Sequence, residues 1–267
     1  MEMKGMMGGF YKISEWIMRL SVTNVLWIIC SIPCLFALFP IFVIQEPGQA
    51  VGYLILSGVI APFTLFPATA AMFGVARKWV MGEVDAPLLK TFFKNYKESY
   101  VQAMLGGILY AVLFVILIVD FRVYLVKLGS MGIISYLFIA LIVLAGVSLL
   151  NFFSMLVHYH MKTLQLLKNA LLITIGRPLR SLMTVILCGA VIGISISSAK
   201  LMFLLPFFTG SVVAAIAFWN FYGIYTKLQM QAEKAAEAEA EEEERKRLEE
   251  DAAILLPNTE DGQTSIK

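Results

Sequence analysis

Few residues in this sequence are of the types that do chemistry, and their spacing favours packing over reaction. Cys30 and Cys34 lie four residues apart, so on a helix they would share a face and supply half of a metal site. No His, Asp or Glu lies nearby to complete that site, and thiols in apolar stretches, Cys188 included, usually pack as small hydrophobes. His158 and His160 stand two residues apart and point to different faces of a helix. We therefore expect no metal and no cofactor.

Four amide side chains are the remaining polar candidates inside the apolar stretches. An amide offers both a donor and an acceptor, so a set of amides can line a path for a polyhydroxylated solute. Amides can also hold helices together, for about 0.6–2 kcal/mol per interhelical hydrogen bond. We favour this second role, because two of the four lie near the ends of their stretches. These candidate polar positions in the bundle are Asn24, Gln102, Asn151 and Asn220.

No catalytic motif accompanies these residues. The chain has no HExxH, GxSxG, P-loop, paired CxxC or glycine-rich dinucleotide motif. Its long apolar stretches also lack Asp, Glu, Lys and Arg, the usual mark of proton or ion coupling. We therefore expect a protein that is not an enzyme, does not hydrolyse ATP itself and is a poor candidate for an ion-coupled carrier.

The composition explains why so few polar groups are found. Of 267 residues, 59% are hydrophobic and only 15% are charged, with a mean hydropathy of +0.79. Soluble domains typically have about 45–50% apolar and about 25% charged residues. This balance argues against a soluble enzyme, a nucleic-acid-binding protein and a secreted disulfide scaffold, and it favours a protein that crosses a membrane several times.

Six uncharged stretches are long enough to cross a bilayer, which takes about 20 helical residues each. Continuous apolarity favours helices over barrel strands, so the predicted fold class is all-α, a bundle of about six transmembrane helices. Only Lys200 separates the last two, which leaves five spans as the alternative. Pro206 and Gly210 offer bends between these last two stretches, and Pro67, Gly106, Gly107 and Gly146 mark possible bends or close helix approaches. The stretches are Ser21–Ile44, Pro47–Ala76, Ser99–Val119, Leu128–Met161, Ser181–Ala199 and Leu201–Thr226.

Basic residues fall almost entirely on one side of this topology. Eighteen Lys and Arg residues lie on the side of the two termini, and three lie on the other side. By the positive-inside rule, both termini are expected in the cytoplasm.

The topology divides the chain into three parts. Residues 1–20 form an amphipathic segment, residues 21–226 form the membrane domain, and residues 227–267 form a charged tail. The amphipathic segment either lies on the inner leaflet or extends the first span. Ten acidic against four basic residues across Glu233–Asp251, in an Ala/Glu-rich context, predict a solvated helix. The candidates for contacts with the interface or with a partner are Trp16, Arg19, Arg77, Lys78 and Trp79.

Two segments resemble a known family. They are GGFYKISEWIMRLSVTNVLW (Gly8–Trp27) and LFPATAAMFGVARKWVMGE (Leu65–Glu83). An amphipathic start that runs into the first span, then FPATAAMF followed by a basic RKW turn, resembles the YesL-like family of bacterial integral membrane proteins. The resemblance covers about Gly8 to Tyr225. It implies a setting beside carbohydrate uptake and glycan degradation in Gram-positive bacteria, and it supplies no catalytic residue.

Two functional hypotheses follow. The first is an accessory or subunit-like component of carbohydrate uptake in the bacterial plasma membrane, without catalytic chemistry of its own. The alternative is a membrane scaffold or regulator that recruits a cytoplasmic partner through its basic loops and acidic tail. The expected partners are the lipid bilayer together with ABC transporter subunits or another cytoplasmic or membrane protein, and no nucleic acid.

Overall fold

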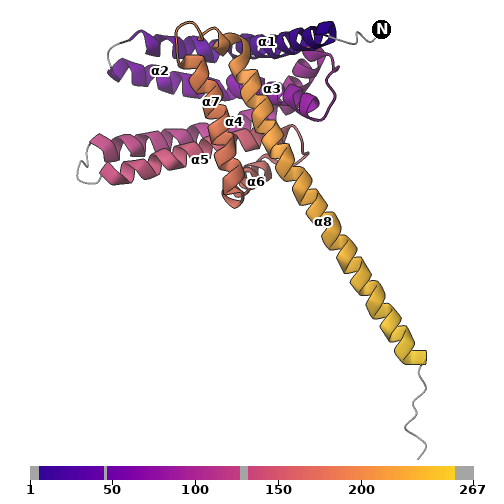
Figure 1. Ribbon diagram of the computed structural model, residues 1–267. Helices are drawn as coiled ribbons and strands as arrows, with labels where there is room; N and C mark the ends of the chain where they lie inside the picture. The colour runs from indigo at the N-terminus through magenta and orange to yellow at the C-terminus, as the bar shows by residue number, and fades with distance from the viewer. Residues whose placement is uncertain (1–5, 45–46, 127–131, 256–267) are drawn as a thin grey trace, which may run out of the picture. The chain divides into compact units, whose positions relative to one another are not determined.

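The part of the chain that the structure describes consists mainly of helices. The computed structural model describes residues 6–44, 47–126 and 132–255, and no strand occurs among them (Figure 1). Short 3-10 turns cover Phe39–Phe42 and Ala61–Phe63, and a π-helical turn covers Leu205–Thr209. The α-helices are α1 (Met6–Leu38), α2 (Pro47–Ile60), α3 (Leu65–Val80), α4 (Leu88–Val126), α5 (Gly132–Leu156), α6 (Thr163–Gly176), α7 (Pro178–Ile196) and α8 (Gly210–Leu255).

The helices agree with the predicted all-α membrane architecture. Five helical segments of the described chain are long and apolar enough to cross a bilayer, and α2 with α3 makes a sixth candidate, bent by 49°. The predicted separation near Lys200 is confirmed, because α7 ends at Ile196 and helical structure resumes at Leu205. The start of the fourth predicted stretch, at Leu128, lies outside the described residues. The chain is thus an all-helical protein built for a membrane.

The bend between α2 and α3 has a specific cause in the sequence. Proline has no N–H, so Pro67 cannot donate to the carbonyl of Phe63 four residues earlier. The hydroxyl of Tyr100 on α4 donates to that carbonyl instead, with an O···O distance of 3.1 Å. The helix therefore breaks at Thr64, and α4 supplies the hydrogen bond that the break leaves unmade.

α3 forms the centre of the bundle because its side chains are small or aromatic. Ala68, Ala70, Ala71 and Ala76 are fully buried, and α3 packs against α1, α4 and α5. Of the glycines predicted as bends or close approaches, Gly106 and Gly107 of α4 are confirmed as close approaches. The prediction was wrong for Gly146, where α5 is continuous and a Cβ would meet nothing within 4 Å. A Cβ at Gly107 would lie 2.7 Å from Cγ of Phe66, and a Cβ at Gly106 would clash with the Phe152 ring.

The chain divides into two compact units, Met1–Tyr222 and Gly223–Lys267. In the first, which we call the bundle, α1 is continuous from Met6, so the predicted N-terminal segment and the first span are one helix. In the second, residues 223–255 complete α8 and form what we call the helical arm. Every side chain from Lys227 to Glu249 is exposed. Residues 256–267 of the predicted tail lie outside the described residues.

Candidate functional site

The most deeply buried amide, Asn24, joins the first helix of the bundle to the last. Its Nδ2 donates to the carbonyl of Leu205 at 3.0 Å, and its Oδ1 accepts from the N–H of Ser211 at 3.0 Å. Leu205 is the first residue of the π-helical turn, and Ser211 lies just after the turn. Within the turn, Pro206 has no N–H to donate and the regular hydrogen-bond ladder is interrupted. Asn24 thus bonds backbone groups beside an irregular turn in an apolar setting. We call this arrangement the Asn24 junction.

The other three amides also join segments that are distant in sequence. Gln102 of α4 donates to the carbonyl of Met161 at 2.8 Å, and Asn151 of α5 donates to Oγ1 of Thr174 at 2.9 Å. Asn220 of α8 donates to the carbonyl of Arg180 at 2.8 Å and accepts from the Arg180 guanidinium at 3.1 Å. In this structure each of the four predicted amides therefore makes a hydrogen bond between helices or between a helix and a connection.

The predicted interfacial residues near the N-terminus lie against the α3–α4 turn. Arg19 is buried and contacts Glu15 on its own helix, the carbonyl of Val84 and the carboxylate of Asp85. Arg19 is therefore held by an i, i+4 ion pair within α1 and by the α3–α4 turn.

A pair of tryptophans lies beside this contact. Trp16 packs edge-on against Trp79, with ring centroids 5.7 Å apart. Trp79 is buried, like Arg19, whereas Trp16 remains partly exposed. Arg19 and Trp79 therefore contact other residues of this chain.

Arg77 and Lys78 end α3 and have different neighbours. Lys78 forms an ion pair with Glu83 at 2.5 Å, near the surface. Arg77 instead lines a pocket of about 780 Å³. Its Nε atom is buried and has no hydrogen-bond partner among the described residues. Arg77 is thus the one predicted interfacial residue that lines this pocket, which we call the basic pocket.

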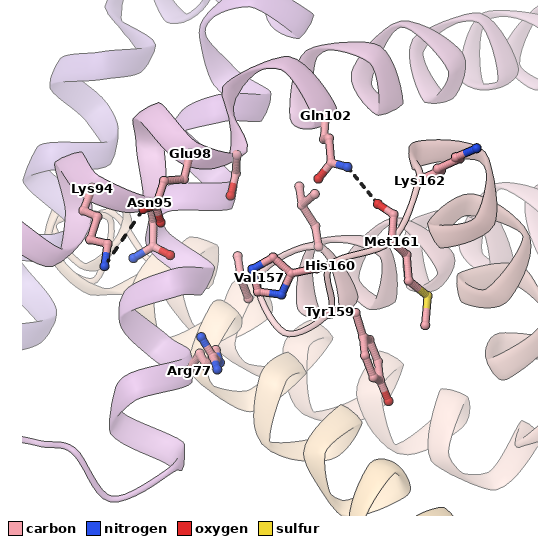
Figure 2. A pocket seen from close by; sticks show the side chains of 12 residues that line it. Arg77, Lys94, Asn95, Glu98, Gln102, Val157, Tyr159, His160, Met161 and Lys162 are labelled. Atoms are coloured by element: carbon pink, nitrogen blue, oxygen red, sulfur yellow. Dashed lines mark hydrogen bonds and ion pairs between the residues drawn. The ribbon is translucent and has the colours of Figure 1, made fainter.

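Three segments at one end of the bundle form the basic pocket. α3 contributes Arg77 from its last turn, and α4 contributes residues from its first turns. The rest comes from the end of α5 and the connection to α6 (Figure 2). The pocket is lined by Arg77, Lys94, Asn95, Glu98, Ser99, Gln102, Leu156, Val157, Tyr159, His160, Met161 and Lys162.

Positive charge exceeds negative charge around the basic pocket. Arg77, Lys94 and Lys162 face a single acid, Glu98. The Lys94–Glu98 ion pair is long, at 3.9 Å, and both side chains are more than half exposed, so it neutralises little charge. In Figure 2 the side chain of Lys162 extends away from His160, which places Lys162 at the rim. The lining therefore suits an anion, with Arg77 and Lys94 as its main contacts.

His158, beside the basic pocket, adds no charge at neutral pH. Its ring lies among the rings of Tyr159, Phe218 and Phe221, with centroids 5.0–6.1 Å apart. Burial lowers the pKa of His158 below its ordinary value of 6.5, and the positive charge of Arg77 lowers it further. His158 is therefore neutral at pH 7 and packs as an aromatic residue.

Sequence reasoning selected Arg77 and Gln102 but missed the pocket as a set. Its other polar members lie on α4 and on the α5–α6 connection, about 60 residues further along the chain. The only feature of the sequence that could have indicated the pocket is the presence of basic residues near the ends of neighbouring helices. Only the packing of α3, α4 and α5 brings them around one cavity.

Comparison with known proteins supports the resemblance. The family described as "Protein of unknown function, DUF624" matches residues 20–121. The Bacillus subtilis (strain 168) protein "Uncharacterized protein YesL" is 27% identical over 226 residues, covering 85% of this chain and 94% of the relative. "Uncharacterized protein YteU", from the same organism, is 27% identical over 237 residues, covering 86% and 90%.

The predicted YesL-like resemblance is confirmed. A third relative, "Uncharacterized protein YesV" of the same organism, is 29% identical over 144 residues, covering 52% of this chain and 67% of the relative. No solved structure gives a significant match. The DUF624 match includes Asn24, Arg77, Lys94 and Gln102, and it ends before α5. The printed names of these relatives state no activity.

Proposed function

We propose that this protein is a non-catalytic accessory component of the plasma membrane that recruits a soluble partner through its helical arm. The observation that carries the proposal is the arm itself. From Lys227 to Glu249 every side chain is exposed in one unbroken helix, and Glu233–Asp251 holds ten acidic against four basic residues. Charged helical faces of this kind steer and select partners of opposite charge. The partner is therefore expected to present a basic surface.

The arm keeps its helix through charge pairs along its own surface. Lys246 lies 2.8 Å from Glu242, and Arg245 lies 3.6 Å from Glu249, both at i, i+4 spacing. Such pairs support an exposed helix by about 0.2–0.5 kcal/mol each. The run Glu241–Glu244 has more acids than these pairs use, which leaves negative charge for a partner.

The hydrogen bonds of the bundle support a structural role for the amides better than a solute path. Asn24, Gln102, Asn151 and Asn220 are each bonded to another part of the chain. A path for a polyhydroxylated solute would need amide groups directed toward it. The proposal therefore makes the protein a scaffold or accessory subunit, with both termini in the cytoplasm by the distribution of Lys and Arg.

The family resemblance proposes carbohydrate uptake as the setting. In that setting the arm would contact the nucleotide-binding subunit of an ABC transporter, because this chain has no ATPase motif.

A C-terminal fusion to a fluorescent protein or to alkaline phosphatase tests whether the C-terminus lies in the cytoplasm. Fluorescence without phosphatase activity is the expected result, and the reverse would contradict it.

Truncation of the arm tests recruitment. Full-length protein and a variant lacking residues 227–267 are purified from gently solubilised membranes of the host grown on a complex glycan. We expect a nucleotide-binding subunit to accompany the full-length protein and to be lost from the truncated one, with membrane insertion unchanged. Equal recovery from both would overturn the role of the arm. Unchanged oligosaccharide uptake in a deletion strain would overturn the uptake setting.

A charge variant separates acidity from helix length. Replacing Glu241–Glu244 with glutamine removes four charges but keeps good helix formers. The matched control replaces Ala235, Ala236, Ala238 and Ala240 with glutamine and keeps the acids. We expect the first variant to lose most of the recovered partner and the control to keep it. Equal recovery from the two would show that charge does not select the partner.

A further inference from the structure

The basic pocket is lined by a cationic side chain, Arg77, that lacks a complete set of hydrogen-bond partners among the described residues. Nε of Arg77 is buried and unbonded among the described residues. A buried donor that lacks an acceptor destabilises the fold, and a charged donor does so more strongly. The one lining acid, Glu98, forms only a long and exposed contact with Lys94. A ligand with acceptor oxygens would complete what the chain leaves open.

The pocket lies where the apolar part of the bundle ends. The apolar segment of α5 runs from Ile134 to Leu156. Leu156 and the next residue, Val157, both line the pocket. On α3, Arg77 follows the fully buried Ala76. The pocket therefore adjoins the end of an apolar span and the polar connection that follows it.

The size and lining indicate the chemical class of the ligand. Pockets for small molecules typically have volumes of about 300–1,000 Å³, and the basic pocket has about 780 Å³. A guanidinium presents a planar fork that matches phosphate oxygens, and an ammonium adds a point charge. Uncharged polar residues, Asn95 and Ser99, also line the pocket and suit hydroxyl groups.

We propose that the basic pocket binds a phosphate group, with Arg77 and Lys94 as its cationic contacts. The phosphate belongs either to the headgroup of an anionic phospholipid or to a soluble phosphate ester. Basic pockets between membrane helices recognise anionic headgroups by this chemistry. The proposal is independent of the helical arm, because every lining residue belongs to the bundle.

The test uses full-length protein in neutral detergent, titrated with dioleoylphosphatidylglycerol, with glycerol 1-phosphate and, as a neutral-headgroup comparison, with dioleoylphosphatidylcholine. Native mass spectrometry counts bound molecules, and thermal unfolding measures the stabilisation. We expect saturable binding of one of the two anionic probes, weakened by added salt because exposed charges are screened. Saturation by the lipid alone assigns the headgroup, and saturation by glycerol 1-phosphate assigns a soluble ester. Binding of neither overturns the proposal.

Variants locate the site. Arg77→Gln and Lys94→Gln should each weaken binding on the order of tenfold, since each removes a hydrogen bond to a charged group. Arg77→Lys keeps the charge without the fork and should restore part of the affinity. The matched control is Lys97→Gln, which makes the same change on an exposed α4 residue outside the lining. Equal affinities for the control and the pocket variants would overturn the assignment, and size-exclusion profiles check that each variant is folded.

Discussion

The Asn24 junction and the basic pocket use polar groups in opposite ways. At the junction, one fully buried amide bonds one backbone group at the start of a π-helical turn and another just after its end, and a Cβ at Gly210 would lie only 2.6 Å from Oδ1 of Asn24. At the pocket, cationic side chains surround open space, and Nε of Arg77 lacks a partner among the described residues. The comparison teaches that polar residues inside the bundle fix its geometry, whereas those at its end remain available for a ligand.

The largest effect is expected from Asn24→Leu. The substitution keeps the volume but leaves the carbonyl of Leu205 and the N–H of Ser211 unsatisfied in an apolar setting. We expect a loss of about 2–4 kcal/mol in the free energy of unfolding. Equilibrium unfolding in mixed micelles measures it.

The comparison for this prediction is Gln102→Leu. Its acceptor, the carbonyl of Met161, lies at the basic pocket, where water can replace the amide. We expect a clearly smaller loss than for Asn24→Leu. Equal losses would remove the distinction between a closed junction and an open pocket.

A second, smaller effect is expected from Gly210→Ala. The added methyl group would displace the Asn24 side chain and break its bond to Ser211, for about 1–3 kcal/mol. Gly146→Ala is the matched control, because a Cβ there meets nothing within 4 Å. Thermal unfolding of both variants measures the difference. A Gly210→Ala protein as stable as the control would show that the junction has room to adjust.

The pH dependence of stability sharpens the comparison on the pocket side. Because the pKa of His158 is lowered in the folded state, the unfolded chain binds this proton at a higher pH. The contribution of His158 is therefore fully present above its ordinary pKa of 6.5 and is lost as the pH falls through the folded pKa. His158→Gln should therefore reduce the decline in melting temperature as the pH falls from about 6.5 through the folded-state pKa of His158. An unchanged slope would assign the titration to another group.

The smallest effect on stability is expected from Lys94→Gln. Its ion pair with Glu98 is long and exposed, so we expect a change below about 0.5 kcal/mol in the free energy of unfolding. The same unfolding measurement used for Asn24→Leu serves here. A loss larger than about 1 kcal/mol would mean that the cations of the pocket hold the fold together.

The sequence predicted the helices well because length and apolarity alone decide whether a segment can cross a bilayer. It also placed the close helix approaches at Gly106 and Gly107, since only residues without a side chain admit a neighbouring ring. The bend was expected at Pro67 but lies at Thr64, because a missing N–H frees a carbonyl four residues earlier.

Other features could not be found along the chain. The partners of Asn24 lie 181 and 187 residues away, so no local pattern indicates them. Arg19 and Trp79 carry the residue types of an interfacial contact, yet tertiary packing buries both. The basic pocket depends on three helix ends that meet only when α3 is enclosed by α4 and α5. Local patterns therefore predict the elements, and their assembly decides which polar residues are exposed.

The sequence separation within the Asn24 junction has a consequence for biosynthesis. At about 5–20 residues per second, the ribosome takes roughly 10–40 s to make the stretch that separates Asn24 from Ser211. During that interval the first helix is already synthesised while its buried amide has none of its native acceptors or donors. A nascent chain that stops before the last helix should therefore keep a polar side chain without its native hydrogen-bond partners, which is costly in an apolar environment.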